Sequence, residues 1–309
     1  MTPNAARPRT CQILAVVNQK GGVGKTTTAV NLAACFAASE RRTLLIDLDP
    51  QGNASSAFGV VNPTQHLYHA LIGECELDEA AQKTALDFLR IVPAGADLVG
   101  AEIELVTSEN RERRLAALLS RARVECEIVV VDCPPSLGLL TLNALTAADS
   151  LLIPLQCEYY ALEGLARLLE TSDLVRENLN PQLALEGVVL TMVDQRNNLS
   201  RQVEAEVRGY LGEKVYRTRI PRNVRLSEAP SHGMPIILYD IHSRGAAAYL
   251  KLADEILQRI DARARPAQAS PTISAARPPL RPELESPVMP DGLPGTGTGA
   301  SDRAGGGDE

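Results

Sequence analysis

The stretch that decides the fold runs from residue 13 to residue 27, where ILAVVN (13–18) leads into NQKGGVGKTT (18–27). Its first part is a short apolar run, which predicts a buried strand. The glycines that follow let the backbone curl so that successive N–H groups point at phosphate oxygens, and the helix expected next adds the positive end of its dipole. A strand, a glycine-rich turn and a helix in this order predict a loop that binds the triphosphate of a nucleotide.

Two lysines flank the glycines, and their expected roles differ. Lys25 is expected to reach the β- and γ-phosphates, and the hydroxyl of Thr26 is expected to ligate Mg²⁺. Lys20 is a second lysine that a phosphate loop does not need. It is either a solvated loop lysine or a cation that neutralises charge on a triphosphate, including that of a facing subunit. The other loop positions predicted to contact the nucleotide are Gly21, Gly22, Val23, Gly24 and Thr27.

Acidic residues end two other apolar runs. Asp132 ends the run IVVVD, which is the usual position of a Walker B carboxylate that holds Mg²⁺. In LLIDLD, Asp47 and Asp49 end a strand expected beside the first one, and a carboxylate there could orient or polarise the attacking water. Period-2 alternation places both on one face, so both could reach the site. We favour Asp49, nearer to the strand end, although Asp49-Pro50 is also a turn signal.

Short apolar runs alternate with helical patterns along the chain. This order predicts β-α-β units and an α/β fold of the P-loop NTPase class, with a mostly parallel twisted sheet flanked by helices on both faces. In such sheets, ligands bind at the carboxyl ends of the strands. The expected strands are 13–18, 43–49, 88–94, 127–134, 150–156 and 186–193, and the expected helices are 26–40, 96–106, 109–123, 161–178, 200–211 and 245–260.

Composition narrows the class of protein. The 309 residues are 45% hydrophobic but only 3% aromatic, so the core must be aliphatic, and the formal charge of −7 argues against a surface coated in nucleic acid. No apolar run approaches the length of a membrane span and the N-terminus lacks a signal-peptide core, so we expect a cytoplasmic protein without a membrane partner. The predicted organisation is a flexible N-terminus (1–11), a nucleotide-binding domain (12–263) and a disordered tail rich in Pro, Gly and Ala (264–309).

The cysteines do not suggest a metal site or a disulfide framework. They lie in apolar settings and never form a C-x-x-C pair. Buried, reduced thiols are therefore expected. The six positions are Cys11, Cys35, Cys75, Cys126, Cys133 and Cys157.

Together, KGGVGKTT, DLDPQGN and DCPPS closely resemble the ParA/MinD superfamily of deviant Walker A ATPases, and within it the chromosomal ParA/Soj partitioning proteins. The resemblance runs from about residue 12 to residue 260 and includes CEYYALEG (157–164), LTMVD (190–194) and IPRNVRLSEAPSHG (220–233). It implies an ATPase that forms an ATP-sandwich dimer, binds DNA non-specifically in that state, and hydrolyses ATP slowly until a ParB partner stimulates it. Association with the nucleoid is implied as well.

The resemblance also assigns roles to residues on the matching motifs. These roles concern the subunit interface, the chemistry and the adenine pocket. The matches are Lys20 as the lysine that crosses to the other subunit's phosphates, Gly21 and Gly22 as the tightly packed interface, Asp49 as the catalytic aspartate, Asp132 as the Walker B residue, and Pro221 and Asn223 as the adenine-pocket segment.

Basic residues gather in one part of this acidic chain. Residues 194–225 contain eight basic and four acidic side chains. A local basic face suits a surface that binds nucleic-acid phosphates without sequence preference. The alternative is a solvated helix face with i,i+4 pairs such as Glu204–Arg208. The DNA contacts of the family match Arg196 and Arg225, so these two are the predicted DNA-binding residues.

Other members of the superfamily fit the sequence less well. A MinD-like positioning ATPase needs an amphipathic C-terminal helix, and nothing after Ile260 offers an apolar face. An iron–sulfur carrier needs paired interface cysteines, and a bacterial tyrosine kinase needs a tyrosine cluster that the tail lacks. An ATP-gated DNA-binding regulator with incidental hydrolysis shares every residue above. A turnover assay with and without DNA and the partner separates it from a partitioning ATPase.

Overall fold

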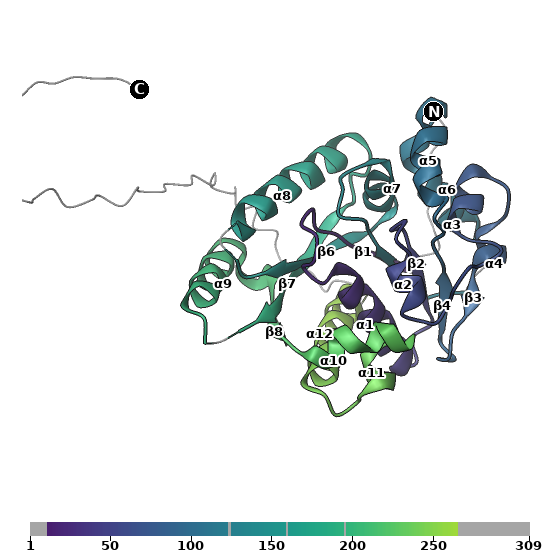
Figure 1. The fold of residues 1–309 in the computed structure, drawn as a ribbon. Coiled ribbons are helices and arrows are strands. Elements are labelled where there is room, and N and C mark those ends of the chain that lie inside the picture. Colours follow the sequence, from purple (N-terminus) through teal and green to yellow (C-terminus); the bar gives the residue numbers. More distant parts are fainter. Residues whose placement is uncertain (1–10, 123–124, 159, 195, 265–309) are drawn as a thin grey trace, which may run out of the picture. The chain divides into compact units, whose positions relative to one another are not determined.

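The computed structural model describes residues 11–122, 125–158, 160–194 and 196–264. They are built around an eight-stranded sheet in the order β3-β4-β2-β5-β1-β6-β7-β8 (Figure 1). Neighbouring strands are parallel except β3 and β4, which pair antiparallel. The strands are β1 (Gln12–Val16), β2 (Thr43–Asp47), β3 (Gln82–Lys83), β4 (Leu89–Val92), β5 (Ile128–Asp132), β6 (Ser150–Gln156), β7 (Ala184–Val193) and β8 (Val215–Pro221).

Helices cover both faces of the sheet because strand side chains alternate between two apolar layers. In β1, Ile13 and Ala15 enter one layer, whereas Leu14 and Val16 enter the other. The predicted α/β sheet with helices on both faces is confirmed (Figure 1). The first layer is closed by α3 (Leu67–Ile72), α4 (Leu77–Ala80), α5 (Leu98–Glu104), α6 (Arg114–Arg121), α7 (Leu139–Ala147), α8 (Ala161–Asn178) and α9 (Asn198–Leu211), and the second by α1 (Lys25–Ala38), α2 (Asn53–Ser56), α10 (Val224–Glu228), α11 (Ile236–Tyr239) and α12 (Arg244–Ala264).

Several predicted bounds are wrong. β2 ends at Asp47, so Asp49 lies in the following turn and not on the strand. The helix predicted over 109–123 is interrupted because Asn110 has a left-handed backbone (φ 56°), and α6 begins only after a short 3-10 turn. The last helix continues to Ala264, one residue into the predicted tail. The remainder of that tail and residues 1–10 lie outside the described residues.

The carboxyl ends of three central strands meet at one point on the sheet edge. β5 lies between β1 and β2, and Asp132 pairs in register with Val16 on one side and Asp47 on the other. β1 lies between β5 and β6. The chain therefore runs from β1 to β2 on one side of this point and from β5 to β6 on the other. Ligands of parallel α/β sheets bind at such a divergence.

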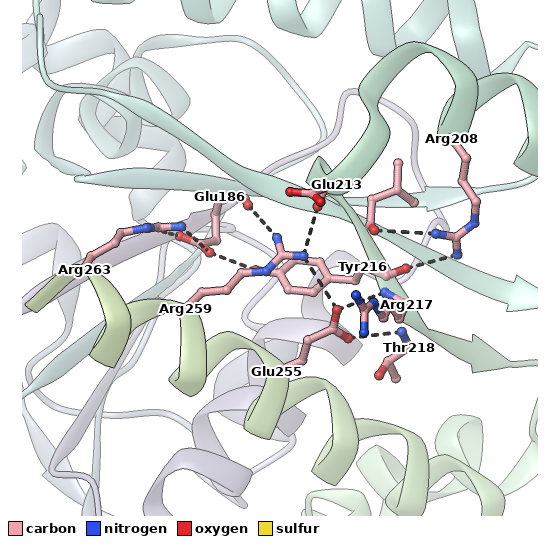
Figure 2. Close-up of polar contacts among 10 residues, drawn as sticks. Glu186, Arg208, Glu213, Tyr216, Arg217, Thr218, Glu255, Arg259 and Arg263 are labelled. Atoms are coloured by element: carbon pink, nitrogen blue, oxygen red, sulfur yellow. Dashed lines mark hydrogen bonds and ion pairs between the residues drawn. The ribbon is translucent and has the colours of Figure 1, made fainter. Parts of the chain in front are cut away.

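A polar cluster ties α12 to the β7–β8 side of the sheet (Figure 2). Glu186 is only 1% exposed, and its carboxylate accepts both terminal guanidinium nitrogens of Arg263 (2.5 and 2.9 Å) and the hydroxyl of Tyr216 (2.9 Å). The guanidinium of Arg259 lies 4.0 Å from the centroid of the Tyr216 ring. Glu255 accepts two backbone N–H groups of β8 (3.0 and 3.1 Å). We call Glu186, Tyr216, Arg259 and Arg263 the Glu186 clamp.

The cysteines are all reduced, but only some are fully buried. Cys35, Cys133 and Cys157 are buried as predicted, whereas the prediction is wrong for the other three, which are partly exposed. Among these, the Sγ atoms of Cys11 and Cys126 lie 3.2 Å apart at the amino ends of β1 and β5. Within the described part of the chain, the helices are too short or too polar to cross a bilayer.

Candidate functional site

The predicted phosphate loop connects β1 to α1 at the carboxyl edge of the sheet. Gly22 and Gly24 have φ values of 74° and 88°, in the left-handed region that favours glycine. The amide of Asn18 donates to a carbonyl of β6 (2.7 Å), while its oxygen accepts the backbone N–H of Lys20 (3.0 Å). From β7, the hydroxyl of Thr191 donates to a loop carbonyl (2.8 Å). The loop is therefore fixed by β6 and β7, which follow β1 on one side of the sheet, before any ligand arrives.

Lys25 is the buried cation of the loop. Its side-chain ammonium donates to the carbonyl of Lys20 (3.1 Å), and the residue is 6% exposed. Burial lowers the pKa of Lys25, and the charges of Asp132 and Asp49 act against that shift. The structure thus brings Lys25 together with both predicted carboxylates.

Asp47 and Asp132 are neighbouring buried carboxylates with opposite surroundings. One oxygen of Asp47 accepts both the N–H and the hydroxyl of Ser55 (2.7 Å each), and the other accepts the N–H of Asp49 (3.3 Å). Neither oxygen of Asp132 has a hydrogen-bond partner among the described residues. Burial, and then the charge of Asp47, raises the pKa of Asp132 well above its usual value. The nearby Thr26 hydroxyl acts to lower that pKa, although it does not meet the geometry of a hydrogen bond to either Asp132 oxygen.

The residues present fit the Mg²⁺ that the resemblance implies. A buried carboxylate with two unpaired oxygens, next to a threonine hydroxyl, offers oxygen ligands that such a cation prefers. Among the described residues, no three His, Cys, Asp or Glu side chains gather closely enough to hold a metal alone. Mg²⁺ commonly uses one or two protein oxygens and completes its shell with substrate phosphates and water. Thr26 and Asp132 would therefore hold Mg²⁺ that arrives with a nucleotide.

The structure separates the two aspartates of DLDPQGN. Asp47 is committed to Ser55 at the start of α2, and burial raises its pKa to about 6. Asp49 is 7% exposed and accepts the N–H of Gln51 (3.0 Å), so the turn signal in the sequence also has a structural basis. Of these two aspartates, Asp47 is the one that accepts a hydrogen bond from a side-chain hydroxyl, that of Ser55 on α2. This arrangement favours Asp49 for water activation, and that role stays a prediction.

Lys20 lies at the exposed surface of the loop. Its ammonium pairs with Glu158, which precedes α8, and both side chains are 46% exposed. A Cβ atom built on Gly21 or Gly22 would meet nothing within 4 Å. Sequence analysis gave no role to Glu158, although the motif CEYYALEG contains it. Lys20 and the two glycines thus form an open surface at the mouth of the loop.

A cleft of about 790 Å³ adjoins the loop and has the size of a small-molecule site. Pro221 and Asn223 line it, beside Gly24, Thr26 and Thr27. The oxygen of Asn223 accepts a backbone N–H at the start of α10 (2.8 Å), which leaves its amide group for a ligand. The remaining polar lining and a left-handed residue within the cleft were not predicted from the sequence. They include Asn31, Asn53, Thr191, Arg222 and Met192 (φ 51°).

The basic segment 194–225 is partly neutralised. Glu204 accepts from Arg208 and from Arg219, both at 2.7 Å, so the predicted i,i+4 alternative is present for this part of the segment. These three side chains, with Arg201, line a second cavity of about 500 Å³. The two guanidinium groups that pair with Glu204 are therefore less available to bind phosphate than the sequence suggests.

The two predicted DNA-binding arginines have different surroundings. Arg196 is exposed in the loop between β7 and α9. Arg225, on α10, is 55% exposed but pairs with Glu228 (3.0 Å) and Asp240 (3.5 Å). A DNA phosphate would have to compete with two carboxylates for Arg225.

Comparisons with known proteins agree on the class of this site. The family model that matches residues 11–185 is described as an AAA domain. A chromosome partitioning protein ParA from Myxococcus xanthus is 57% identical over 250 residues, which cover 80% of this chain and 88% of that protein. The sporulation initiation inhibitor protein Soj from Bacillus subtilis is 55% identical over 247 residues, covering 79% and 98%. A crystal structure of cobyrinic acid a,c-diamide synthase from Mycobacterium smegmatis, with bound ATP analog and magnesium, is 36% identical, covers 82% of this chain and 97% of that one, and has a TM-score of 0.72.

Proposed function

This chain belongs to the ParA/Soj family of chromosome-partitioning ATPases, and on that premise we propose that it works as an ATP-gated dimer on DNA. It is a P-loop ATPase that uses ATP and Mg²⁺. In the proposed cycle, residues 12–263 form an ATP-sandwich dimer that binds DNA non-specifically on the nucleoid. Hydrolysis is slow until a ParB-like DNA-binding protein stimulates it, and repeated cycles drive partitioning of a chromosome or plasmid.

The observation that carries the proposal is the unsatisfied carboxylate of Asp132, at the end of β5 beside a preformed phosphate loop. A buried carboxylate without hydrogen bonds is costly, and a bound cation offsets that cost. Lys25 supplies the fixed positive charge for the phosphates, and Asp49 lies close enough to act on both by its charge. Mg²⁺, when bound, would neutralise phosphate charge at Thr26 and Asp132. Asp49 would then orient or polarise the attacking water.

The open surface at the mouth of the loop supports the sandwich dimer. Gly21 and Gly22 leave room for another backbone, and Lys20 lies beside them. To cross to a facing subunit, Lys20 must leave Glu158. That exposed ion pair is worth at most about 1 kcal/mol, so it is a small barrier to such a movement.

The exposed position of Arg196 supports DNA binding by the dimer. One chain is acidic as a whole, and Glu204 neutralises two arginines of segment 194–225, so a monomer should bind DNA weakly. Two copies would double the phosphates contacted, and each contact releases counterions. Because Arg225 is shared with Glu228 and Asp240, we expect Arg196→Ala to weaken binding more than Arg225→Ala.

The decisive experiment measures ATP turnover, mass and DNA binding in the same preparations. Wild type should turn over slowly with ATP alone and faster with DNA plus the ParB-like protein. Asp49→Ala should bind ATP, accumulate as a dimer in light scattering, and lose turnover. Lys25→Ala should lose ATP binding in calorimetry. DNA affinity should be higher with a non-hydrolysable ATP analogue than with ADP, and should fall steeply with salt for unrelated duplexes alike.

Each part of the proposal can fail separately. Equal DNA affinity in the two nucleotide states would remove ATP gating. Turnover that ignores the ParB-like protein while gating persists would favour an ATP-gated DNA-binding regulator with incidental hydrolysis. A monomeric Asp49→Ala variant that still hydrolyses ATP would move catalysis to another residue.

A further inference from the structure

An exposed apolar face on α5 has no role in the nucleotide site. Val99, Ile103 and Val106 are 55%, 73% and 55% exposed. They recur at i, i+4 and i+7 along α5 and the 3-10 turn that continues it (Leu105–Thr107), so they share one side of the helix. The other side is buried in the first apolar layer. We call these three residues the α5 face.

Acidic groups flank the α5 face, and one basic side chain also reaches it, since Arg111 donates to the carbonyl of Val106 (2.7 Å). Residues 96–110 contain four acidic residues and no Lys or Arg, and helical spacing places Glu102 and Glu104 on opposite flanks of the face. The neighbouring segment 67–95 adds five acidic residues against two basic ones. Glu104 is held in place by the hydroxyl of Tyr68 on α3 (2.9 Å). DNA would be repelled here, and a second copy presenting the same face would set acid against acid.

The face also connects to the loop that contains Asp132. Glu102, on one flank, accepts the backbone N–H of Leu140 at the start of α7 (3.4 Å). Its carboxylate packs so closely on Gly138 that a Cβ atom there would lie 2.4 Å away. Only residues 133–138 separate Asp132 from α7. A ligand that moves α5 or recruits Glu102 therefore acts directly on the segment following Asp132.

We propose that the α5 face docks a protein segment that carries Lys or Arg around an apolar anchor, and that this contact stimulates hydrolysis through Glu102 and residues 133–138. The apolar centre with acidic flanks fits that chemistry by charge complementarity. The inference rests on the proposed stimulation by a ParB-like protein and names the surface on which it acts.

The test titrates the ParB-like protein into the full chain with ATP and DNA and follows turnover. Ile103→Asn should raise the concentration for half-maximal stimulation about tenfold, because an anchoring apolar contact is lost. Glu104→Lys should raise it as well and weaken its salt dependence. Unstimulated turnover and DNA binding should match wild type. Leu174→Asn, an equally simple change at a 60% exposed position on α8, should change nothing.

The outcomes separate this inference from the function it rests on. If wild type is stimulated and both α5 variants respond like wild type, the docking surface is wrong and the proposed function stands. If wild type is not stimulated at all, the proposed stimulation fails and this inference fails with it. If Ile103→Asn instead abolishes the ATP-dependent dimer in light scattering, the face belongs to a second copy of the chain, which also overturns the proposal.

Discussion

Two carboxylates are buried at opposite ends of the same sheet, and their surroundings differ completely. Glu186, near the amino end of β7, accepts from Arg263 and from Tyr216 (Figure 2). Asp132, at the carboxyl end of β5, is as deeply buried and accepts from no described residue. A carboxylate saturated by the protein joins elements together. One left unsatisfied raises the energy of the empty protein and lowers it again when a cation binds.

The largest expected effect on stability comes from the saturated carboxylate. Arg263→Ala should lower the free energy of unfolding by about 3 kcal/mol, because Glu186 stays buried and loses two charged hydrogen bonds. The control is Arg167→Ala, which breaks an exposed ion pair with Glu163 and should cost less than about 0.5 kcal/mol. Urea unfolding at pH 7.5 measures both. Equal losses would mean that the Glu186 clamp adds no more than a surface pair.

The stability of the chain should depend on pH because of the two carboxyls at the carboxyl edge of the sheet, Asp47 and Asp132. Burial raises the pKa of Asp47 to about 6 and that of Asp132 well above its usual value, so both favour the protonated form when folded. Their stabilising contribution is present below the unfolded value of about 4 and is lost as pH rises through the folded pKa values, about 6 for Asp47. Between pH 5 and 7.5, the nucleotide-free chain should lose at least about 1 kcal/mol of unfolding free energy, which is the loss expected from Asp47 alone. Stability that rises across this window would contradict the buried pair.

Substitution of Asp132 should have the opposite sign from that of Arg263. Asp132→Asn replaces an ionisable carboxyl, buried beside Asp47, with a neutral amide, so it should raise the stability of the nucleotide-free chain by about 1–2 kcal/mol and flatten its pH profile. It should also abolish the effect of Mg²⁺ on ATP affinity in calorimetry. Asp47→Asn is the matched control and should not stabilise, because the amide disrupts acceptance from Ser55 and Asp49. A destabilised Asp132→Asn chain would mean that Asp132 already has a partner.

The smallest stability effect is expected at the mouth of the loop. Gly21→Val should change the unfolding free energy by less than about 0.5 kcal/mol, since its side chain enters open space, yet the ATP-dependent dimer should be lost. Gly22→Val serves as a comparison, because its φ of 74° adds roughly 1–2 kcal/mol of backbone strain. Sedimentation with a non-hydrolysable ATP analogue distinguishes dimer from monomer. A Gly21→Val dimer would show that this glycine lies outside the interface.

Sequence patterns predicted the parts of the fold whose signal is local. The apolar runs of β1, β2 and β5 and the glycines after β1 are sufficient for the sheet and the loop. β8 was missed because two exposed arginines, Arg217 and Arg219, interrupt its buried residues, and these charges suggested a surface instead. α7 was missed because its sequence, LLTLNALTA, is apolar around most of its circumference and shows no helical period.

The pairing of charged side chains could not be predicted from the sequence. Nothing local distinguishes Asp47 from Asp49, since the choice depends on Ser55 eight residues later. The eight basic residues of segment 194–225 looked alike, but Glu204 neutralises two of them and residues outside the segment engage Arg225. Such pairings depend on which elements the fold brings together.

The Glu186 clamp also decides where the chain can be shortened safely. Arg263 belongs to the last turn of α12, and Tyr216 of the clamp lies on the strand whose far end, Pro221, lines the nucleotide cleft. A chain cut after Ile260 keeps every nucleotide motif but loses Arg263, and its β8 strand is held less firmly at the clamp. Weak ATP binding in that truncation would be ascribed wrongly to loss of the tail after Ala264, although loss of Arg263 would be its cause. A deletion that tests the tail should therefore begin after Ala264.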